Sequence, residues 1–182
     1  LYRRIEFEGT VLFRWRSYIP LILLLLALPA ITDNVTSGSP IESGFAHLFV
    51  YGCMAISVLG QGIRIVTVGF SPDGTSGRNT RAQRADLLNT TGIYSIVRNP
   101  LYLGNFLVIL GIALALKVWW FPIVVSLAYW LYIERVIAAE ETYLAEKFGD
   151  VYESWVLRTP AFLPKFSNWV ASEHGFSWRM IL

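Results

Sequence analysis

Four long apolar segments dominate this 182-residue chain and limit what it can fold into. They lie at about Tyr18–Ile31, Phe45–Phe70, Leu101–Leu116 and Val118–Ala139. A helix rises ~1.5 Å per residue, so about 20 residues cross the ~30 Å hydrocarbon core of a bilayer. The first and third segments are shorter and need flanking residues or a locally thinner bilayer. The pattern predicts an all-α integral membrane protein with about four transmembrane helices.

The composition excludes several other classes of protein. The chain is 54% hydrophobic and 15% charged, which is too apolar for an ordinary soluble domain. Its net charge of +2 gives no strong attraction for nucleic acid. Cys53 is the only cysteine, and His47 and His174 are isolated from one another. We therefore expect no intrachain disulfide and no metal site.

The positive charges predict the orientation. With the N-terminus in the cytoplasm, every Lys and Arg except Lys117 falls on the cytoplasmic side or at an inner helix end. Both termini are then cytoplasmic, in a bacterial inner membrane or, in a eukaryote, the endoplasmic reticulum. Lys117 alone separates the third and fourth segments, which predicts a tight helical hairpin. We interpret the first segment as a retained span; a cleaved signal peptide is the alternative.

A first polar cluster stands where the chain enters the third apolar segment. Pro100 is well placed as the first residue of that helix, whose N-terminus suits an anionic group such as a carboxylate or phosphate. Arg98 adds a bidentate donor, and Tyr94 and Tyr102 add aromatic faces with hydroxyl groups. The alternative is an interfacial anchor with ordinary packing of small residues.

Two glycines follow on one side of the same helix. Gly104 and Gly111 recur at a seven-residue spacing, which permits close approach of a ligand or of another helix.

A second polar cluster lies within Glu134–Trp155, after the fourth segment. A continuous helix there would carry Glu134 and Glu141 on its apolar stripe, with Glu140 adjacent. Ionisable groups at membrane depth are costly and tend to mark function. Arg135 and the arginine of the first cluster are candidate partners. A charged helix exit from the bilayer is the alternative interpretation. Together the two clusters suit a mixed-charge cofactor with hydroxyls and an aromatic ring, which S-adenosylmethionine satisfies without being singled out.

The motifs make the interpretation more specific. "GIYSIVRNPLYLG" (Gly92–Gly104) and "EETYLAEKFGDVY" (Glu140–Tyr152), followed by "TPAFLP", resemble the isoprenylcysteine carboxyl methyltransferase and phospholipid methyltransferase superfamily of integral membrane enzymes. The resemblance implies a single membrane domain over residues 1–182, a cytoplasmic C-terminal helix and no Rossmann domain. It implies S-adenosylmethionine bound on the cytoplasmic side by segments at about 71–104 and 134–164.

The residues that match the family motifs are the candidate cofactor-binding residues. They are Tyr94, Arg98, Asn99, Pro100, Tyr102, Leu103, Gly104, Glu140 and Glu141. Two positions depart from the family pattern. Asn99 stands where many members have histidine, and it cannot titrate. Ala161 stands where a basic residue is common, which argues against a prenylcysteine carboxylate as the acceptor.

We therefore expect in-line transfer of a methyl group from S-adenosylmethionine to a lipid or lipid-linked carboxylate, phosphate or amine. The candidate catalytic residues are Arg98 and Arg135, which would orient an anionic acceptor, and Glu141, which would take a proton from an amine. Two alternatives stay open: an NADPH-dependent membrane lipid or sterol reductase, and a membrane protein without enzymatic activity. The sequence leaves the acceptor, the oligomeric state and the role of residues 167–182 unassigned.

Overall fold

The computed structural model describes residues 29, 31–32, 44–71 and 86–180. Within these residues the elements in chain order are α4 (Gly44–Gly69), η1 (Ile93–Ser95), α5 (Pro100–Ala115), α6 (Phe121–Phe148), α7 (Asp150–Arg158), η2 (Phe166–Asn168) and η3 (Trp178–Met180). The described part of the chain has no strand, only an isolated bridge between Gly92 and Val170. The predicted all-α class is confirmed for this part.

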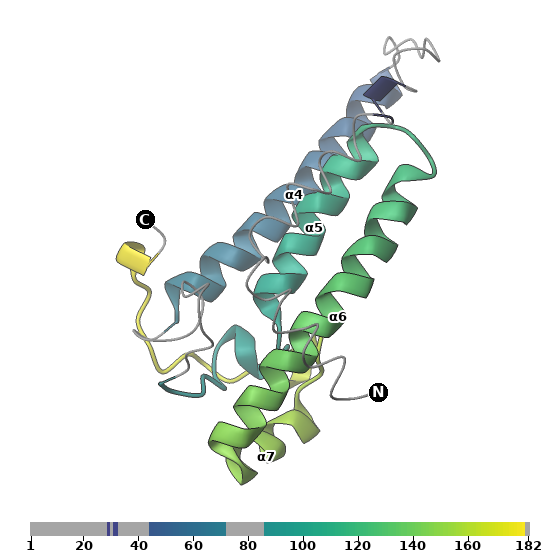
Figure 1. The fold of residues 1–182 in the computed structure, drawn as a ribbon. Helices are drawn as coiled ribbons and strands as arrows, with labels where there is room; N and C mark the ends of the chain where they lie inside the picture. The colour runs from purple at the N-terminus through teal and green to yellow at the C-terminus, as the bar shows by residue number, and fades with distance from the viewer. Residues whose placement is uncertain (1–28, 30, 33–43, 72–85, 181–182) are drawn as a thin grey trace.

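Three long helices lie side by side and form the body of the molecule (Figure 1). α5 begins with Pro100, whose fixed φ suits a first helical turn, and α6 carries a proline in its own first turn. α5 and α6 run in opposite directions and are joined through Lys117, which adopts a positive φ of 56°. The second and third predicted segments agree closely with α4 and α5.

Glycines allow α4 and α5 to pack closely. A Cβ atom added at Gly60 would lie 2.6 Å from the carbonyl oxygen of Gly104, and one added at Gly111 would lie 2.5 Å from the carbonyl oxygen of Cys53. A Cβ at Gly62 would meet nothing within 4 Å. Ser57 Oγ donates across the same contact to the carbonyl oxygen of Val108 at 3.1 Å. The two glycines of α5 therefore serve helix–helix contact.

Two helices are long and apolar enough to cross a membrane, His47–Gly69 and Phe121–Phe148. Only 11% and 28% of their apolar windows are buried in the protein, unlike the core helix of a soluble domain. Their outward surfaces expose large side chains: Leu48, Met54, Val58, Leu59, Ile123, Leu127, Trp130 and Leu131. These surfaces suit lipid, and the chain is a membrane protein. α5, with 16 residues, is shorter than these two.

Several topological predictions reach beyond what these helices show. The first predicted span, at about 18–31, lies almost entirely outside the described residues. The count of four spans, the membrane hairpin and the cytoplasmic position of both termini therefore stay predictions.

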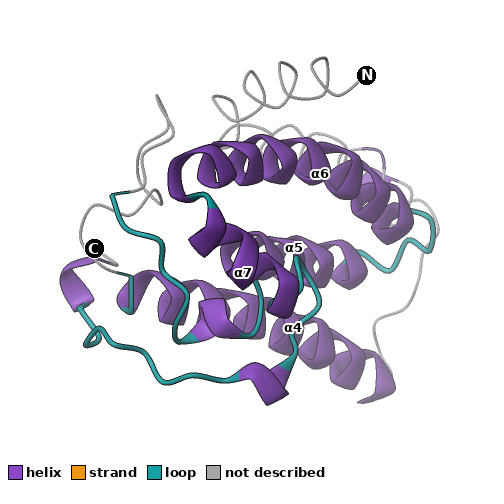
Figure 2. Ribbon diagram, turned by 90° about the horizontal axis from the view of Figure 1, so that it is seen from below, coloured by secondary structure: helices purple, strands orange, loops and turns teal. Residues whose placement is uncertain are grey.

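The end of the fourth segment differs from the prediction. α6 continues past Ala139 to Phe148. The prediction of one continuous helix as far as Trp155 is wrong, because the helix breaks at Gly149. Gly149 has φ 50° and ψ −128°, a conformation that glycine adopts at little cost. α7 then begins at Asp150 and lies at the lower end of the bundle in Figure 1, in front of α5 when the molecule is seen from below (Figure 2). The break brings α7 against the segment that precedes α5.

Candidate functional site

An arginine–glutamate pair joins the two polar clusters. Arg98 Nε donates to Glu141 Oε1 at 2.9 Å, and Arg98 Nη2 donates to Glu141 Oε2 at 3.2 Å. The side chains are 13% and 27% exposed, so solvent screens this bidentate pair only partly. Arg98 precedes α5 and Glu141 lies late in α6, 43 residues apart in sequence. The structure thus brings the two motifs into direct contact.

The same arginine also holds the segment that follows α7. Arg98 Nη1 donates to the carbonyl oxygens of Val156, at 3.2 Å, and Thr159, at 3.0 Å. Its backbone N–H donates to the carbonyl oxygen of Pro160 at 2.9 Å. The carbonyls of Val156 and Thr159 belong to the end of α7, where a helix leaves its last acceptors without partners, and Pro160 follows directly. Arg98 therefore satisfies helix-end carbonyls and fixes α7 beneath α5.

Asn99 adds a further link in this network. It is the N-cap residue of α5, yet its side chain makes no capping hydrogen bond. Instead Asn99 Nδ2 donates to the carbonyl oxygen of Ala161 at 3.1 Å and approaches Glu141 Oε1 at 3.5 Å. Asn99 and Ala161, the two residues that depart from the family pattern, are thus in contact with each other.

The second glutamate of the pair has a different partner. Tyr102 OH donates to Glu140 Oε2 at 2.9 Å. The carbonyl oxygen of Tyr102 in turn accepts a 2.7 Å hydrogen bond from Tyr129 OH on α6. Glu140 and Glu141 therefore face different parts of α5: one meets its first turn and the other meets the arginine before it.

Tyr94 lies at the edge of this network. Its carbonyl oxygen accepts a 3.0 Å hydrogen bond from Trp155 Nε1 of α7. Burial, and secondly the charge of Glu140, raise the pKa of the Tyr94 hydroxyl to about 12, although a hydrogen bond with Ser71 acts in the opposite direction. Tyr94 is therefore neutral over the whole physiological range.

Two buried hydroxyls in the described part of the chain lack a hydrogen-bond partner: Tyr152 OH and Thr159 Oγ1. Both residues are nearly inaccessible, at 4% and 2% exposure. Burial and the neighbouring Glu141 raise the pKa of Tyr152, while Arg98 lowers it. An unpartnered buried hydroxyl is costly, so each of the two is a candidate contact for a bound ligand or water.

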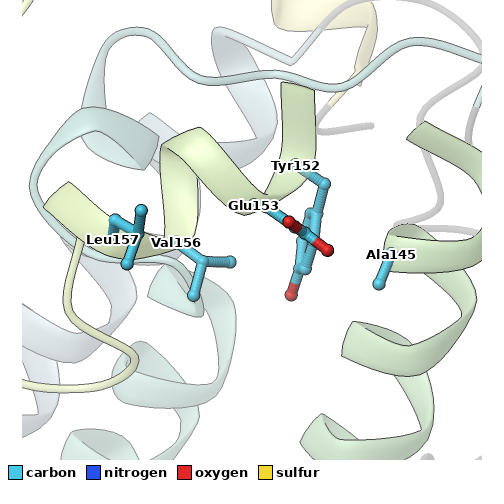
Figure 3. Close-up of a pocket in the computed structure, with 5 residues that line it drawn as sticks. All are labelled: Ala145, Tyr152, Glu153, Val156 and Leu157. Carbon is cyan, nitrogen blue, oxygen red and sulfur yellow. The ribbon is translucent and has the colours of Figure 1, made fainter. Parts of the chain in front are cut away.

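A cavity of about 270 Å³ has Tyr152 in its lining. It lies between the end of α6 and α7 and is lined by Ala145, Tyr152, Glu153, Val156 and Leu157. Figure 3 shows the ring of Tyr152 projecting from α7 into the space that separates it from Ala145. The lining is mostly apolar, with the carboxylate of Glu153 at one side.

The predicted site residues thus fall into two groups. Arg98, Asn99, Tyr102, Glu140 and Glu141 are joined by hydrogen bonds at one end of the helix bundle. The remaining residues of α5 shape the backbone there, because Pro100 is buried in its first turn, Leu103 packs inward and Gly104 lies against Arg64 of α4.

The candidate residue Arg135 and the stripe residue Glu134 lie earlier on α6. Arg135 Nη1 donates to the carbonyl oxygen of Leu131 on its own helix, and Glu134 is exposed. Sequence reasoning did not single out Tyr152 and Thr159 as site residues, although Tyr152 ends the second motif and Thr159 begins "TPAFLP".

Comparison with known proteins identifies the family of this chain. A family model described as phospholipid methyltransferase matches residues 50–151. The match includes the first motif, the second motif up to its last residue, and the helices α5 and α6 that carry them, over more than half of the chain. No solved structure matches.

Three curated relatives are similar to parts of the chain. Protein-S-isoprenylcysteine O-methyltransferase of Schizosaccharomyces pombe is 37% identical over 85 residues, which is 47% of this chain and 36% of the relative. The cobalt-zinc-cadmium resistance protein CzcN of Cupriavidus metallidurans is 36% identical over 108 residues, 58% of this chain and 47% of the relative. The nickel-cobalt-cadmium resistance protein NccN of Alcaligenes xylosoxydans xylosoxydans is 36% identical over 80 residues, 44% of this chain and 37% of the relative.

Each match spans less than half the length of the relative. The family model covers the whole region in which Arg98 and Glu141 meet, and one relative is named as a methyltransferase. The chain therefore belongs to the phospholipid methyltransferase family of membrane methyltransferases.

Proposed function

We propose that this protein transfers the methyl group of S-adenosylmethionine to a lipid or lipid-linked acceptor at the cytoplasmic face of its membrane. The observation that carries the proposal is the Arg98–Glu141 pair, which joins the two family motifs at the end of a lipid-facing helix bundle. The family and the relative named as an isoprenylcysteine O-methyltransferase support methyl transfer to a lipid-linked group.

The residues at this end of the bundle fit S-adenosylmethionine. The ligand carries an amine, a carboxylate and a positively charged sulfonium, together with ribose hydroxyls and an adenine ring. Glu140 offers a carboxylate to hydroxyls or to a cationic centre. The two buried hydroxyls of Tyr152 and Thr159 lack partners, and Tyr94 offers an aromatic ring. When bound, the cofactor supplies an electrophilic methyl group.

The protein's own residues then act mainly by positioning. Arg98 has its guanidinium engaged with Glu141 and with two carbonyls, so we assign it the role of a positioning residue that fixes Glu141 and the end of α7. In-line displacement depends on alignment of the reacting groups more than on covalent catalysis. By fixing Glu141 and the end of α7, Arg98 would keep the walls of the site in the geometry that alignment requires.

The acceptor decides whether a base is needed. A carboxylate or phosphate acceptor carries no proton to remove, and Arg135 would orient it. An amine acceptor must lose a proton, which a carboxylate such as Glu141 or a water molecule would accept. Position 161 is alanine, so the segment after α7 offers no cation there for an anionic head group.

The test is transfer of tritium-labelled methyl from S-adenosylmethionine to the lipid extract of native membranes that contain the protein. We expect labelled lipid with the wild type and with Glu134→Gln, an exposed glutamate on the same helix. We expect at least a tenfold lower rate with Glu141→Gln, because the substitution removes the charge opposite Arg98. Equal labelling of lipid by the wild type and both variants would contradict the proposal. So would unlabelled lipid together with consumption of NADPH.

A further inference from the structure

The last described segment of the chain, residues 159–180, runs across the polar end of the helix bundle as a strap. Lys165 N donates to the carbonyl oxygen of Ile96 at 2.9 Å, and Gly92 N donates to the carbonyl oxygen of Val170 at 2.9 Å. Ser177 N donates to the carbonyl oxygen of Gly69, the last residue of α4, at 2.8 Å. Seen from below, the strap follows one edge of the molecule and ends beside α4 (Figure 2). It thus ties the segment before α5 to the end of α4.

The strap exposes large apolar side chains along its length. Leu163 is 78% exposed, Phe166 is 75%, Trp169 is 58% and Trp178 is 68%. Exposed apolar surface of this extent is typical of an interaction site and not of a water-facing loop. Two exposed cations, Lys165 and Arg179, lie directly beside Phe166 and Trp178 in sequence.

The position of the strap indicates what covers these side chains. Phe176 packs edge-on against Phe70 at 5.2 Å and against Trp178 at 5.0 Å, measured between ring centroids. This cluster begins at the point where the lipid-facing surface of α4 ends, since Val66 in the last turn of that helix is still 38% exposed. The Phe176–Trp178 end of the strap therefore adjoins the end of a bilayer-facing helix.

The residue types suit the boundary between hydrocarbon and water. Tryptophan is enriched there because its ring is apolar and its N–H is polar. Lysine and arginine are favoured at the same depth, because the phosphates of anionic lipids attract them.

We propose that the strap docks into the head-group layer of the same bilayer that α4 crosses, on the leaflet reached by Gly69. Phe166, Trp169 and Trp178 are the apolar anchors, and Lys165 and Arg179 face lipid phosphate. Docking would fix the depth of the segment before α5, because the strap is hydrogen-bonded to it. The inference rests on exposure and position alone and does not depend on the proposed methyl transfer.

The experiment measures the depth of single spin labels in proteoliposomes that contain anionic lipid. Cys53→Ala removes the only native cysteine, and single cysteines then replace Trp169 or Trp178 in the strap. Val58, 69% exposed on α4, supplies the lipid reference, and Asp150, exposed at the start of α7, supplies the water reference. Power-saturation spectra with oxygen and with a water-soluble nickel chelate give the depth of each label.

We expect both strap labels to favour oxygen over nickel, at a depth between the two references. Labels as accessible to nickel as the one at Asp150 would overturn the proposal. So would dipolar broadening between labels, which would place a second copy of the chain on the strap. Because replacing a tryptophan could unfold the strap, labels at the exposed Ser167 and Ala171 are measured as a second set and must give the same result.

Discussion

The contact between α4 and α5 and the polar end of the bundle both hold α5 in place, but by opposite means. Along α4 and α5, glycines remove side chains and let the two backbones meet, with Gly60 facing Gly104. At the polar end, charged side chains fill the space. The single side chain of Arg98 donates hydrogen bonds to Glu141 and to two backbone carbonyls. The first region depends on shape, and the second depends on charge and hydrogen bonds. We therefore expect substitutions in the first region to act through steric contact, and those in the second to act through charge and hydrogen bonds on both stability and ligand binding.

The largest effect is expected where a side chain is added between the helices. Gly60→Ala places a Cβ 2.6 Å from a backbone oxygen and 2.8 Å from the backbone nitrogen of Val108, so the helices must move apart. We expect a loss of about 1–3 kcal/mol in the free energy of unfolding in detergent. Gly62→Ala on the same helix meets nothing within 4 Å and is expected to be neutral or to stabilise by up to ~1 kcal/mol. Equal melting temperatures for the two variants would contradict the close contact.

The next effect concerns the charge pair. Glu141→Gln leaves Arg98, which is only 13% exposed, without its counter-charge, so we expect a loss of about 2 kcal/mol. A double-mutant cycle with Arg98→Met should give a coupling energy of about 1–3 kcal/mol from chemical denaturation. Glu134→Gln, on the exposed side of the same helix, serves as the control. Additive single effects in the cycle would show that the pair does not act as a unit.

A smaller effect is expected only at alkaline pH. The pKa of Tyr94 is raised from 10.0 to about 12, so the unfolded chain loses the proton first as pH rises. The stability from the neutral, partly buried Tyr94 is complete below pH ~10 and is lost between pH ~10 and ~12, by at most about 3 kcal/mol. Tyr94→Phe should flatten this loss of stability when melting is followed from pH 8 upward. An unchanged slope would show that Tyr94 ionises equally in both states.

The smallest effect is expected for a single neutral hydroxyl. Tyr102→Phe removes the 2.9 Å hydrogen bond to Glu140 and should cost about 1 kcal/mol of stability. Tyr51→Phe, on the 63% exposed surface of α4, should cost nothing measurable. If the two variants melt alike, Glu140 does not depend on Tyr102 for its position.

The sequence predicted the helices well because apolar length and proline are local signals. The start of α5 at Pro100 follows from the fixed φ of proline, and the extent of α4 follows from an apolar run bounded by polar residues. The break between α6 and α7 was missed, because a glycine inside a helical pattern is read as tolerated. Only the three-dimensional arrangement shows that Gly149 takes a positive φ there.

The candidate site was predicted in part for a similar reason. The motifs identified Arg98 and Glu141, and paired charges 43 residues apart are a reasonable expectation for two such clusters. The partners that are backbone atoms were not predictable, since the carbonyls of Val156 and Thr159 carry no sequence signal. Residues 167–180 of the strap were unassigned because their irregular backbone has no periodicity and the strap's bonds to Gly92 and Gly69 are long-range.

Calorimetric titration of the purified protein with S-adenosylhomocysteine tests the central claim most directly, namely that the polar end of the bundle is a methyl-donor site. The account predicts micromolar binding by the wild type and by Glu134→Gln, and at least tenfold weaker binding by Glu141→Gln, with no binding of NADPH. Equal affinity in all three proteins, or binding of NADPH in place of S-adenosylhomocysteine by folded protein, would contradict it.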